Sequence, residues 1–202
     1  MAKNIVIFLH GVGSRGSHLE PILDYWKSKM PEVIFAAPNA PFPFAGGGDG
    51  FEWFSLNAIS EQNRPQRVLE AREHFDNTLN QVLAEHGASF EHDHVLLVGF
   101  SQGSIMTLDA LASGRLNVAG AVAFSGRFAS VEPYTPRTGT PLLLVHGKSD
   151  GVISWHESEN SAQAFKQLGL KVDTLYEEGL EHTVSQQGAD RAAAFIANVF
   201  SS

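Results

Sequence analysis

The chain alternates short apolar runs with segments of helical periodicity, and this alternation constrains its fold more than any other feature. The apolar runs cover residues 5–9, 33–37, 95–100, 118–124, 141–147 and 172–176. Several runs are apolar at consecutive positions, so both faces of the strand would be buried, as in a parallel sheet with helices on both sides. Helical spacing covers 68–83, 154–168 and 185–200, and Gly87 and Gly169 are typical helix stops. The pattern predicts an α/β fold with a doubly wound, mostly parallel sheet.

Length and composition indicate one ordinary globular domain over residues 1–202. Hydrophobic residues make up 43% and charged residues 18%, and there is no repeat, low-complexity tract or linker. One segment, 38–66, departs from the alternation, with three prolines before a triple glycine and five aromatic side chains. This aromatic content is more typical of a functional loop than of disorder. No insertion is long enough for a large lid.

Charge and cysteine content argue against several functions. Fourteen basic and 22 acidic residues give a net charge of −8, with no run of Lys or Arg, which argues against nucleic-acid binding. No segment approaches the roughly 18 apolar residues of a membrane span, and the run after Met1 is too short for a signal peptide. The absence of cysteine removes disulfides, thiolate metal sites and a cysteine nucleophile. We therefore expect a cytoplasmic protein with no nucleic-acid partner and no stable membrane insertion.

A serine stands where one of the predicted strands ends. The sequence Gly99-Phe100-Ser101-Gln102-Gly103 is the G-x-S-x-G pattern, with an apolar strand before it and a helical segment after it. On this sharp turn small residues at −2 and +2 let strand and helix approach, and the serine Oγ projects above the sheet. The Gln102 N–H would lie at a helix N-terminus, which favours a developing oxyanion. The alternative is a chance match in which Ser101 only caps the helix.

A serine nucleophile needs a base, and the base needs an orienting acid, which follow the serine in the order Asp or Glu, then His. Asp150 comes shortly after the apolar run 141–147, and His182 lies between the last predicted strand and the last predicted helix. Both would reach the same edge of the sheet as Ser101. Singly, Asp150 could be a turn residue and His182 a solvated loop histidine. Together with the serine motif they favour a catalytic triad.

The other histidines are weaker candidates for chemistry. His156 falls inside a predicted helix and is expected at the surface. His10 and His146 precede glycine at strand ends, and we expect them to hydrogen-bond the loops there. The sequence Glu-His-Asp-His at 91–94 invites a metal interpretation, but such a pair of histidines entering a strand is usually solvated. We expect neither a metal nor a cofactor.

Four motifs resemble, in order and spacing, the α/β-hydrolase family of bacterial phospholipase/carboxylesterases and acyl-protein thioesterases. They are FLHGVG (8–13), GFSQG (99–103), LVHGKSDGVI (144–153) and GLEH (179–182). EWFSL (52–56) and SGRFAS (125–130) look closest to its small bacterial carboxylesterase branch. The resemblance spans nearly the whole chain and implies Ser101 as nucleophile, Asp150 as acid and His182 as base.

The resemblance also implies an oxyanion hole and part of a substrate site. The loop after the first His-Gly would supply the Val12 N–H as the second oxyanion donor beside Gln102. Trp53 would lie near the acyl pocket, and we include the neighbouring aromatic residues Phe51 and Phe54 in the expected substrate site.

This chain departs from the family pattern at two places. An acidic residue commonly follows the first His-Gly, where this chain has Ser14 and Arg15. A proline commonly follows the catalytic Asp, where this chain has Gly151. Both departures bear on loop shape and substrate preference and leave the catalytic groups in place.

The expected function is therefore a serine carboxylesterase that forms an acyl-enzyme. The uncharged stretch 33–48 and the aromatic segment 38–56 suggest short to medium apolar acyl groups. A thioesterase with the same triad is the alternative among enzymes, and a metallohydrolase is a further one. A non-catalytic binding module that keeps the fold is the alternative of another class. Exposed apolar loop surface leaves a homodimer open.

Overall fold

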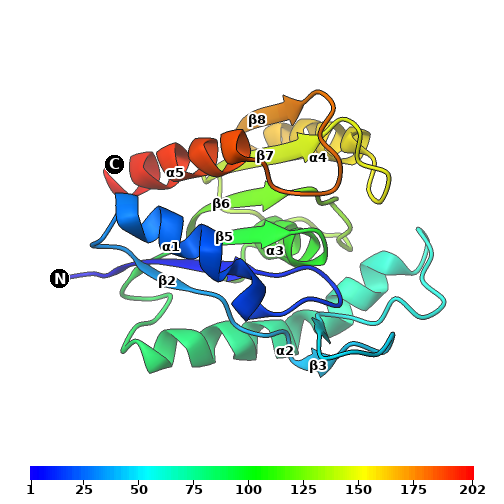
Figure 1. Cartoon of the computed structure of the whole chain (residues 1–202), viewed down its shortest axis with the longest axis horizontal. Coiled ribbons are helices and arrows are strands. Elements are labelled where there is room, and N and C mark those ends of the chain that lie inside the picture. The colour runs from blue at the N-terminus through cyan, green and yellow to red at the C-terminus, as the bar shows by residue number, and fades with distance from the viewer.

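The computed structural model describes residues 1–202, with a six-stranded parallel sheet at its centre (Figure 1). The strands are β1 (Asn4–Leu9), β2 (Ile34–Ala36), β5 (His94–Phe100), β6 (Val118–Phe124), β7 (Pro141–Gly147) and β8 (Lys171–Glu177). Their order is β2-β1-β5-β6-β7-β8, and every neighbouring pair is parallel. The chain thus builds outward from β1 in both directions, and ligands bind such sheets beyond the carboxyl ends of the strands at this reversal. The predicted α/β fold is confirmed.

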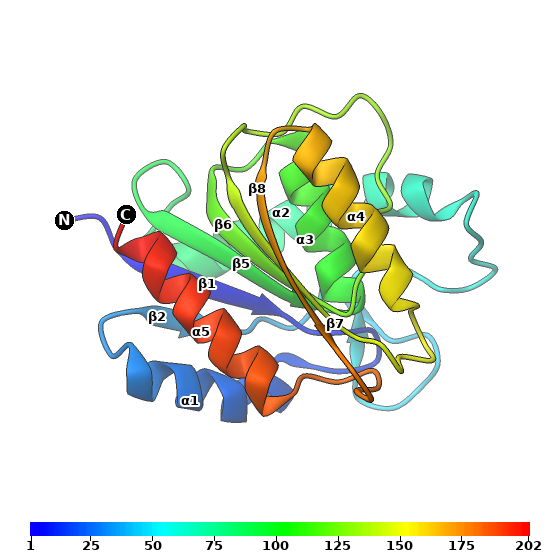
Figure 2. The same ribbon diagram turned by 90° about the horizontal axis from the view of Figure 1, so that it is seen from above.

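Helices cover both faces of the sheet (Figure 2). A 3-10 turn, η1 (Gly16–Leu19), precedes the helices, which are α1 (Glu20–Lys29), α2 (Arg64–Glu85), α3 (Gln102–Ser113), α4 (Trp155–Gln167) and α5 (Gln186–Phe200). α1 and α5 pack on one face, and α2, α3 and α4 pack on the other. None of these helices has both the length and the hydropathy needed to cross a bilayer.

Alternate residues of the strands feed two separate apolar layers. In β1, Ile5, Ile7 and Leu9 belong to the apolar layer on the side of α2, α3 and α4, whereas Val6 and Phe8 belong to the layer on the side of α1 and α5. All five side chains are fully buried. This burial on both faces is the reason that the strands are apolar at consecutive positions.

The irregular segment before α2 is braced against the loop that follows β1. It contains only a short antiparallel pair, β3 (Phe42–Pro43) and β4 (Phe51–Glu52). The Gly13 N–H donates to the Phe51 carbonyl and the Phe51 N–H donates to the Ser14 carbonyl, both at 2.8 Å. A Cβ on Gly50 would lie 2.0 Å from the Gly13 carbonyl oxygen, so only glycine fits there. The segment therefore fixes the loop after β1 from outside.

Candidate active site

Ser101 occupies a sharp turn between β5 and α3. Its φ of 56° and ψ of −115° lie in a region that residues with a Cβ rarely adopt. A Cβ on Gly99 would lie 2.5 Å from the Ser104 nitrogen, and one on Gly103 would lie 2.0 Å from the Leu9 carbonyl oxygen. Strand and helix therefore meet as closely as the motif predicts. Ser101 stands at the N-cap position of α3, but its hydroxyl makes no capping bond, so the side chain is not used to cap the helix.

The structure brings Ser101, His182 and Asp150 together from three loops at the carboxyl edge of the sheet. The Ser101 Oγ lies 3.0 Å from the His182 Nε2, and the His182 Nδ1 lies 2.6 Å from the Asp150 Oδ2. The Asp150 side chain is fully buried, whereas that of His182 remains 18% exposed. In this arrangement the Nδ1–H donates to the carboxylate and leaves Nε2 free to accept the serine proton.

The carboxylate of Asp150 accepts hydrogen bonds on both oxygens. Its Oδ1 accepts from the N–H groups of Val152 and Ile153 at 2.8 and 2.9 Å. Its Oδ2 accepts from His182 and lies 3.2 Å from the His146 Nε2. Burial raises the pKa of Asp150, but the bonds from His182 and the two amides outweigh burial, so the pKa lies below its ordinary value. The group therefore stays ionised at neutral pH.

His146 lies beneath this carboxylate and connects it to α4. Its Nε2 lies 2.7 Å from the Ile153 carbonyl oxygen, and its Nδ1 lies 2.6 Å from the Ser158 Oγ. A carbonyl can only accept, so Nε2 carries the proton and Nδ1 accepts from the hydroxyl. Burial lowers the pKa of His146, which keeps the ring neutral. The prediction that His146 hydrogen-bonds a loop is confirmed.

Two backbone amides near Ser101 are free to bind an oxyanion. A Cβ on Gly11 would lie 3.3 Å from the Ser101 Cβ, so the loop after β1 lies directly against the serine. The next N–H, that of Val12, donates to no group in the protein. Gln102 is the first residue of α3, where an N–H has no acceptor one turn earlier. Both amides predicted as oxyanion donors therefore flank the serine without an internal partner.

The side chain of Gln102 has a positioning role that the sequence did not predict. Its Oε1 accepts from the Trp53 N–H at 2.7 Å, and its Nε2 donates to the Phe54 carbonyl at 2.8 Å. The residue after the serine thus anchors the segment before α2 through its side chain, while its own N–H, at the first position of α3, has no acceptor one turn earlier. The variable positions of G-x-S-x-G carry no pattern that would have revealed this contact.

His10 holds the loop of the candidate oxyanion hole in shape. Its Nε2 accepts from the Ala40 N–H at 2.9 Å, so its Nδ1 carries the proton and donates to the Gly11 carbonyl at 2.7 Å. Its own carbonyl accepts from the Trp53 Nε1 at 2.9 Å. Burial lowers the pKa of His10 and keeps the ring neutral. The expected structural role of His10 is confirmed.

The three aromatic residues expected at the substrate site differ in exposure. Trp53 is 1% exposed and packs edge-on against Phe75, and Phe54 is 4% exposed. Phe51 is half-buried, with the Arg15 guanidinium 5.7 Å from its ring centroid. Their contact with substrate stays a prediction. The burial of Trp53, together with its bond to the His10 carbonyl, gives this side chain a role in holding the loop after β1.

The remaining candidates lie away from the three side chains. His156 is on α4, 62% exposed, and pairs with Glu159, as expected of a surface residue. His94 begins β5 and bonds the Asn4 side chain at the opposite edge of the sheet. No group of three or more His, Cys, Asp or Glu side chains is placed to hold a metal ion.

Comparison with known proteins places the chain among hydrolases. The phospholipase/carboxylesterase family matches residues 1–200. Esterase YpfH of Escherichia coli (strain K12) is 28% identical over 92% of this chain and 78% of its own length. Acyl-protein thioesterase 1 of Candida albicans is 29% identical over 98% of this chain and 93% of its own.

Solved structures agree with these sequence relatives. Esterase PE8 superposes with a TM-score of 0.88 and is 32% identical, covering 98% of this chain and 93% of its own. SOBER1 of Arabidopsis thaliana superposes with a TM-score of 0.80 at 24% identity, covering 98% of this chain and the whole of its own, and shows the shared fold.

Proposed function

The chain belongs to the phospholipase/carboxylesterase family, and from that premise we propose that it hydrolyses carboxylic esters of short to medium apolar acids with Ser101 as nucleophile. His182 is the general base and Asp150 the acid that orients it. The observation that carries the proposal is the pair of hydrogen bonds at 3.0 and 2.6 Å that joins these three side chains. The pKa of Asp150, held below its ordinary value, supports a partner for the imidazole that is ionised at neutral pH.

In the first half of the reaction the Ser101 Oγ attacks the ester carbonyl as His182 Nε2 takes its proton. The carbonyl oxygen becomes an oxyanion that the Val12 and Gln102 amides stabilise. Asp150 holds the Nδ1–H tautomer and stabilises the imidazolium. The intermediate then collapses: the bond from the carbonyl carbon to the alcohol oxygen breaks, and that oxygen takes the proton from Nε2.

In the second half water replaces the alcohol. His182 takes a proton from water as its oxygen attacks the acyl-serine carbonyl, and the same amides hold the second oxyanion. Breaking the bond to Ser101 Oγ releases the acid, and the proton on Nε2 returns to the serine. The cycle balances with water as the only co-reactant, so the mechanism needs neither metal nor cofactor.

A fluorophosphonate that reacts with activated serines tests this assignment. Wild-type protein should be labelled at one site, and Ser101→Ala should lose both labelling and ester hydrolysis, with kcat falling on the order of 10⁴–10⁶. Circular dichroism of the variant serves as the control for folding. Absence of labelling in folded wild-type protein would refute the proposal and favour a non-catalytic binding module.

Thioester hydrolysis is the second candidate, because several relatives carry the name acyl-protein thioesterase 1. The same three side chains would attack a thioester carbonyl, with a thiolate as the leaving group. Matched oxygen esters and thioesters of the same acid separate the two activities by their kcat/KM values.

The remaining expectations concern domain organisation, localisation and oligomeric state. We infer that residues 1–202 act as one domain in the cytoplasm, on small-molecule substrates. Large apolar side chains that are exposed amount to Met1, Phe42, Leu56 and Val152. A homodimer stays a prediction, which light scattering of the purified protein tests.

A further inference from the structure

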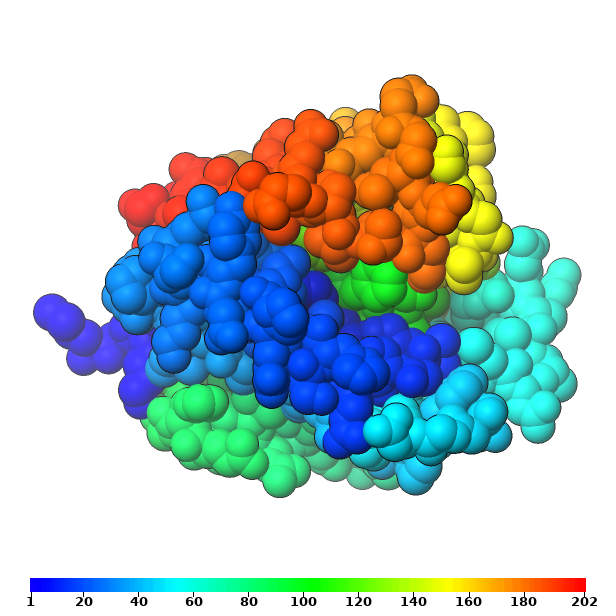
Figure 3. Space-filling model, in the orientation of Figure 1, coloured from blue at the N-terminus to red at the C-terminus, as the bar shows by residue number.

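An apolar cavity of about 470 Å³ is lined by Phe100 and Thr183, the chain neighbours of Ser101 and His182. It lies where the segment around η1 and the first half of α1 faces residues 183–189. In Figure 3 this is the hollow between the blue and the orange chain, with green atoms of the segment near residue 100 at its floor. Its volume is within the range of small-molecule sites, about 300–1,000 Å³.

The chemistry of the cavity walls selects a neutral, apolar occupant. The deep walls are aliphatic or aromatic, and include Phe8, Ile22, Phe100 and Val184. No Asp, Glu, Lys or Arg lines the cavity. Polar residues such as His18 lie at the exposed rim. A charged ligand would therefore lose its hydration here without gaining a partner.

The cavity shares a wall with the reacting groups. Phe100 immediately precedes Ser101, and its ring centroid lies 4.9 Å from that of His182. Thr183, which follows His182, is another lining residue. The position of a Cβ on Gly11 is 3.3 Å from both the Phe100 ring and the Ser101 Cβ. The imidazole itself does not line the cavity, so a chain that starts at the imidazole reaches the cavity past the Phe100 ring.

The leaving group is the part of an ester that must lie next to this imidazole. The carbonyl oxygen faces the Val12 and Gln102 amides, whereas the alcohol oxygen takes its proton from His182 Nε2. Resting on the proposed function, we propose that this cavity binds the alcohol portion of the ester and that the enzyme selects neutral, apolar alcohols.

A second cavity differs from this one in the charge of its lining. It has a volume of about 550 Å³, lies between residues 42–55 and α2, and includes the charged side chains of Glu52, Arg67 and Glu70 in its lining. It adjoins the backbone segment that the Gln102 side chain anchors. The cavity at Phe100 therefore lacks the charged side chains that line the cavity at Trp53 and Phe54.

Two ester series measure the proposal. One series joins acetic acid to methanol, butanol and hexanol, and the other joins methanol to acetic, butyric and hexanoic acids. In wild-type protein each added alcohol methylene should raise kcat/KM roughly fourfold until the cavity is full. Ile22→Trp, which fills the cavity from α1, should abolish this rise. Ile22→Ala, which enlarges the cavity, should extend it to longer alcohols. Neither variant should change the dependence on acyl length.

Val199→Trp is the matched control, because Val199 is a partly buried aliphatic residue on α5 packed against the same core layer as Ile22. Its dependence on alcohol length should equal that of the wild type. Fluorophosphonate labelling reports whether each variant keeps a folded site.

Labelled protein whose kcat/KM ignores alcohol length, or whose alcohol dependence survives Ile22→Trp, would overturn the proposal. An effect of Ile22→Trp on the acyl series alone would assign the cavity to the acid instead and would equally overturn it. Wild-type protein that is neither labelled nor active would refute the proposed function, and the cavity assignment with it.

Discussion

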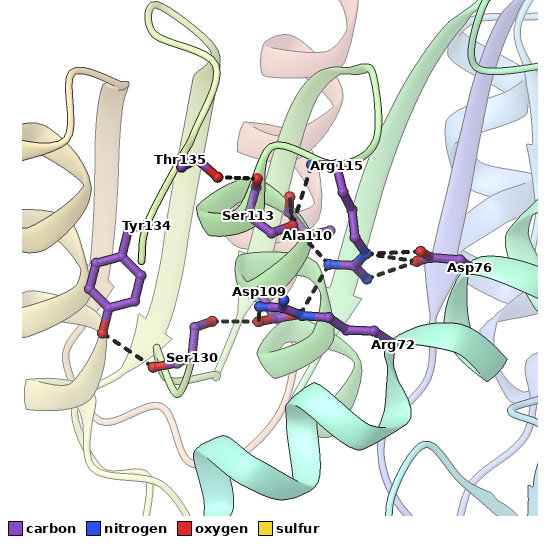
Figure 4. A network of polar contacts seen from close by, with 9 residues as sticks. All are labelled: Arg72, Asp76, Asp109, Ala110, Ser113, Arg115, Ser130, Tyr134 and Thr135. Atoms are coloured by element: carbon purple, nitrogen blue, oxygen red, sulfur yellow. Dashed lines mark hydrogen bonds and ion pairs between the residues drawn. The ribbon is translucent and has the colours of Figure 1, made fainter. Parts of the chain in front are cut away.

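Asp109 and Asp150 both bury their carboxylates completely, yet different partners compensate the charge. Asp109, on α3, accepts from the Arg72 Nε and Nη2 at 2.8 Å each, from the Arg115 Nη1 at 3.1 Å and from the Ser130 Oγ at 2.7 Å (Figure 4). Asp150 has two backbone amides and the rings of His146 and His182 instead. One carboxylate is held by permanent cations and the other by neutral donors.

The network around Asp109 extends across three parts of the chain. Arg115 also binds Asp76 of α2, with its Nη2 2.8 Å from the carboxylate (Figure 4). The pKa of Arg72 is raised, chiefly by its hydrogen bonds to Asp109. α2, α3 and the segment around Ser130 are therefore joined by charges that do not change during a reaction.

The comparison teaches that the partner, and not the burial, decides what a buried carboxylate does. An arginine keeps its proton under all conditions, so Asp109 is always paired and contributes to stability. A histidine can gain a proton, so Asp150 can stabilise a charge that exists only while the reaction proceeds. Three changes can break or sharpen this contrast.

Asp150→Asn should have the largest effect, and chiefly on activity. The amide oxygen can still accept from Val152 and Ile153, but it no longer stabilises a charged His182. We expect kcat for a soluble ester to fall on the order of 10⁴ while the melting temperature stays near that of the wild type. Steady-state kinetics and a thermal melt on one preparation check both parts. A large drop in stability would show that Asp150 is mainly structural.

Asp109→Ala should have the second largest effect, and on stability alone. The change leaves Arg72 and Arg115 without their shared buried partner, which should cost about 3–5 kcal/mol in free energy of unfolding. Urea denaturation measures this loss. The protein that stays folded should keep kcat within a few fold of the wild type, and a loss comparable with that of Asp150→Asn would break the contrast.

Lowering the pH should have the smallest of the three effects, a loss of folding stability that arises from protonation of Asp150. Its pKa in the folded state lies below the ordinary value of about 3.9, so the ionised group stabilises the fold above that value. This contribution is lost as the pH falls through the folded pKa. Urea melts from neutral into acidic solution should therefore show a steeper decline for wild type than for Asp150→Asn. If the free energy of unfolding depended on pH equally in the two proteins, the lowered pKa of Asp150 would be contradicted.

The sheet and the three catalytic candidates could be predicted because their signals are local. Strands buried on both faces are continuous apolar runs, and Ser101 lies in a motif whose glycines are required by contacts at 2.0–2.5 Å. Asp150 and His182 follow from their order and their places after strands. Parallel strands bring such loops to one edge, which turns order in the sequence into proximity in space.

Other parts of the fold have no local signal. α3 is buried on nearly every side and lacks the periodicity of a surface helix, so the helical segment there is predicted with the G-x-S-x-G motif and without a periodic pattern. α1 buries only Leu23 and Trp26 and has a proline in its first turn, and the apolar pattern predicts no helix there. The pair β3 and β4 is too short to have an alternating pattern.

The supporting contacts of the site depend on packing between distant segments. Arg72 meets Asp109 only because α2 lies against α3, 37 residues further along the chain. The contacts of the Gln102 side chain with Trp53 and Phe54 arise in the same way. A single sequence contains the residues of such contacts, but it gives no information on which of them pair in the fold.

The positive φ of Ser101 has a consequence for laboratory evolution of this protein. Glycine would adopt that conformation without strain, so a Ser101→Gly change, which removes the proposed nucleophile, would make the turn easier to form. A library screened for heat resistance alone would consequently enrich inert clones at this position. Directed evolution of this protein for thermal stability therefore has to select for catalytic activity in every round.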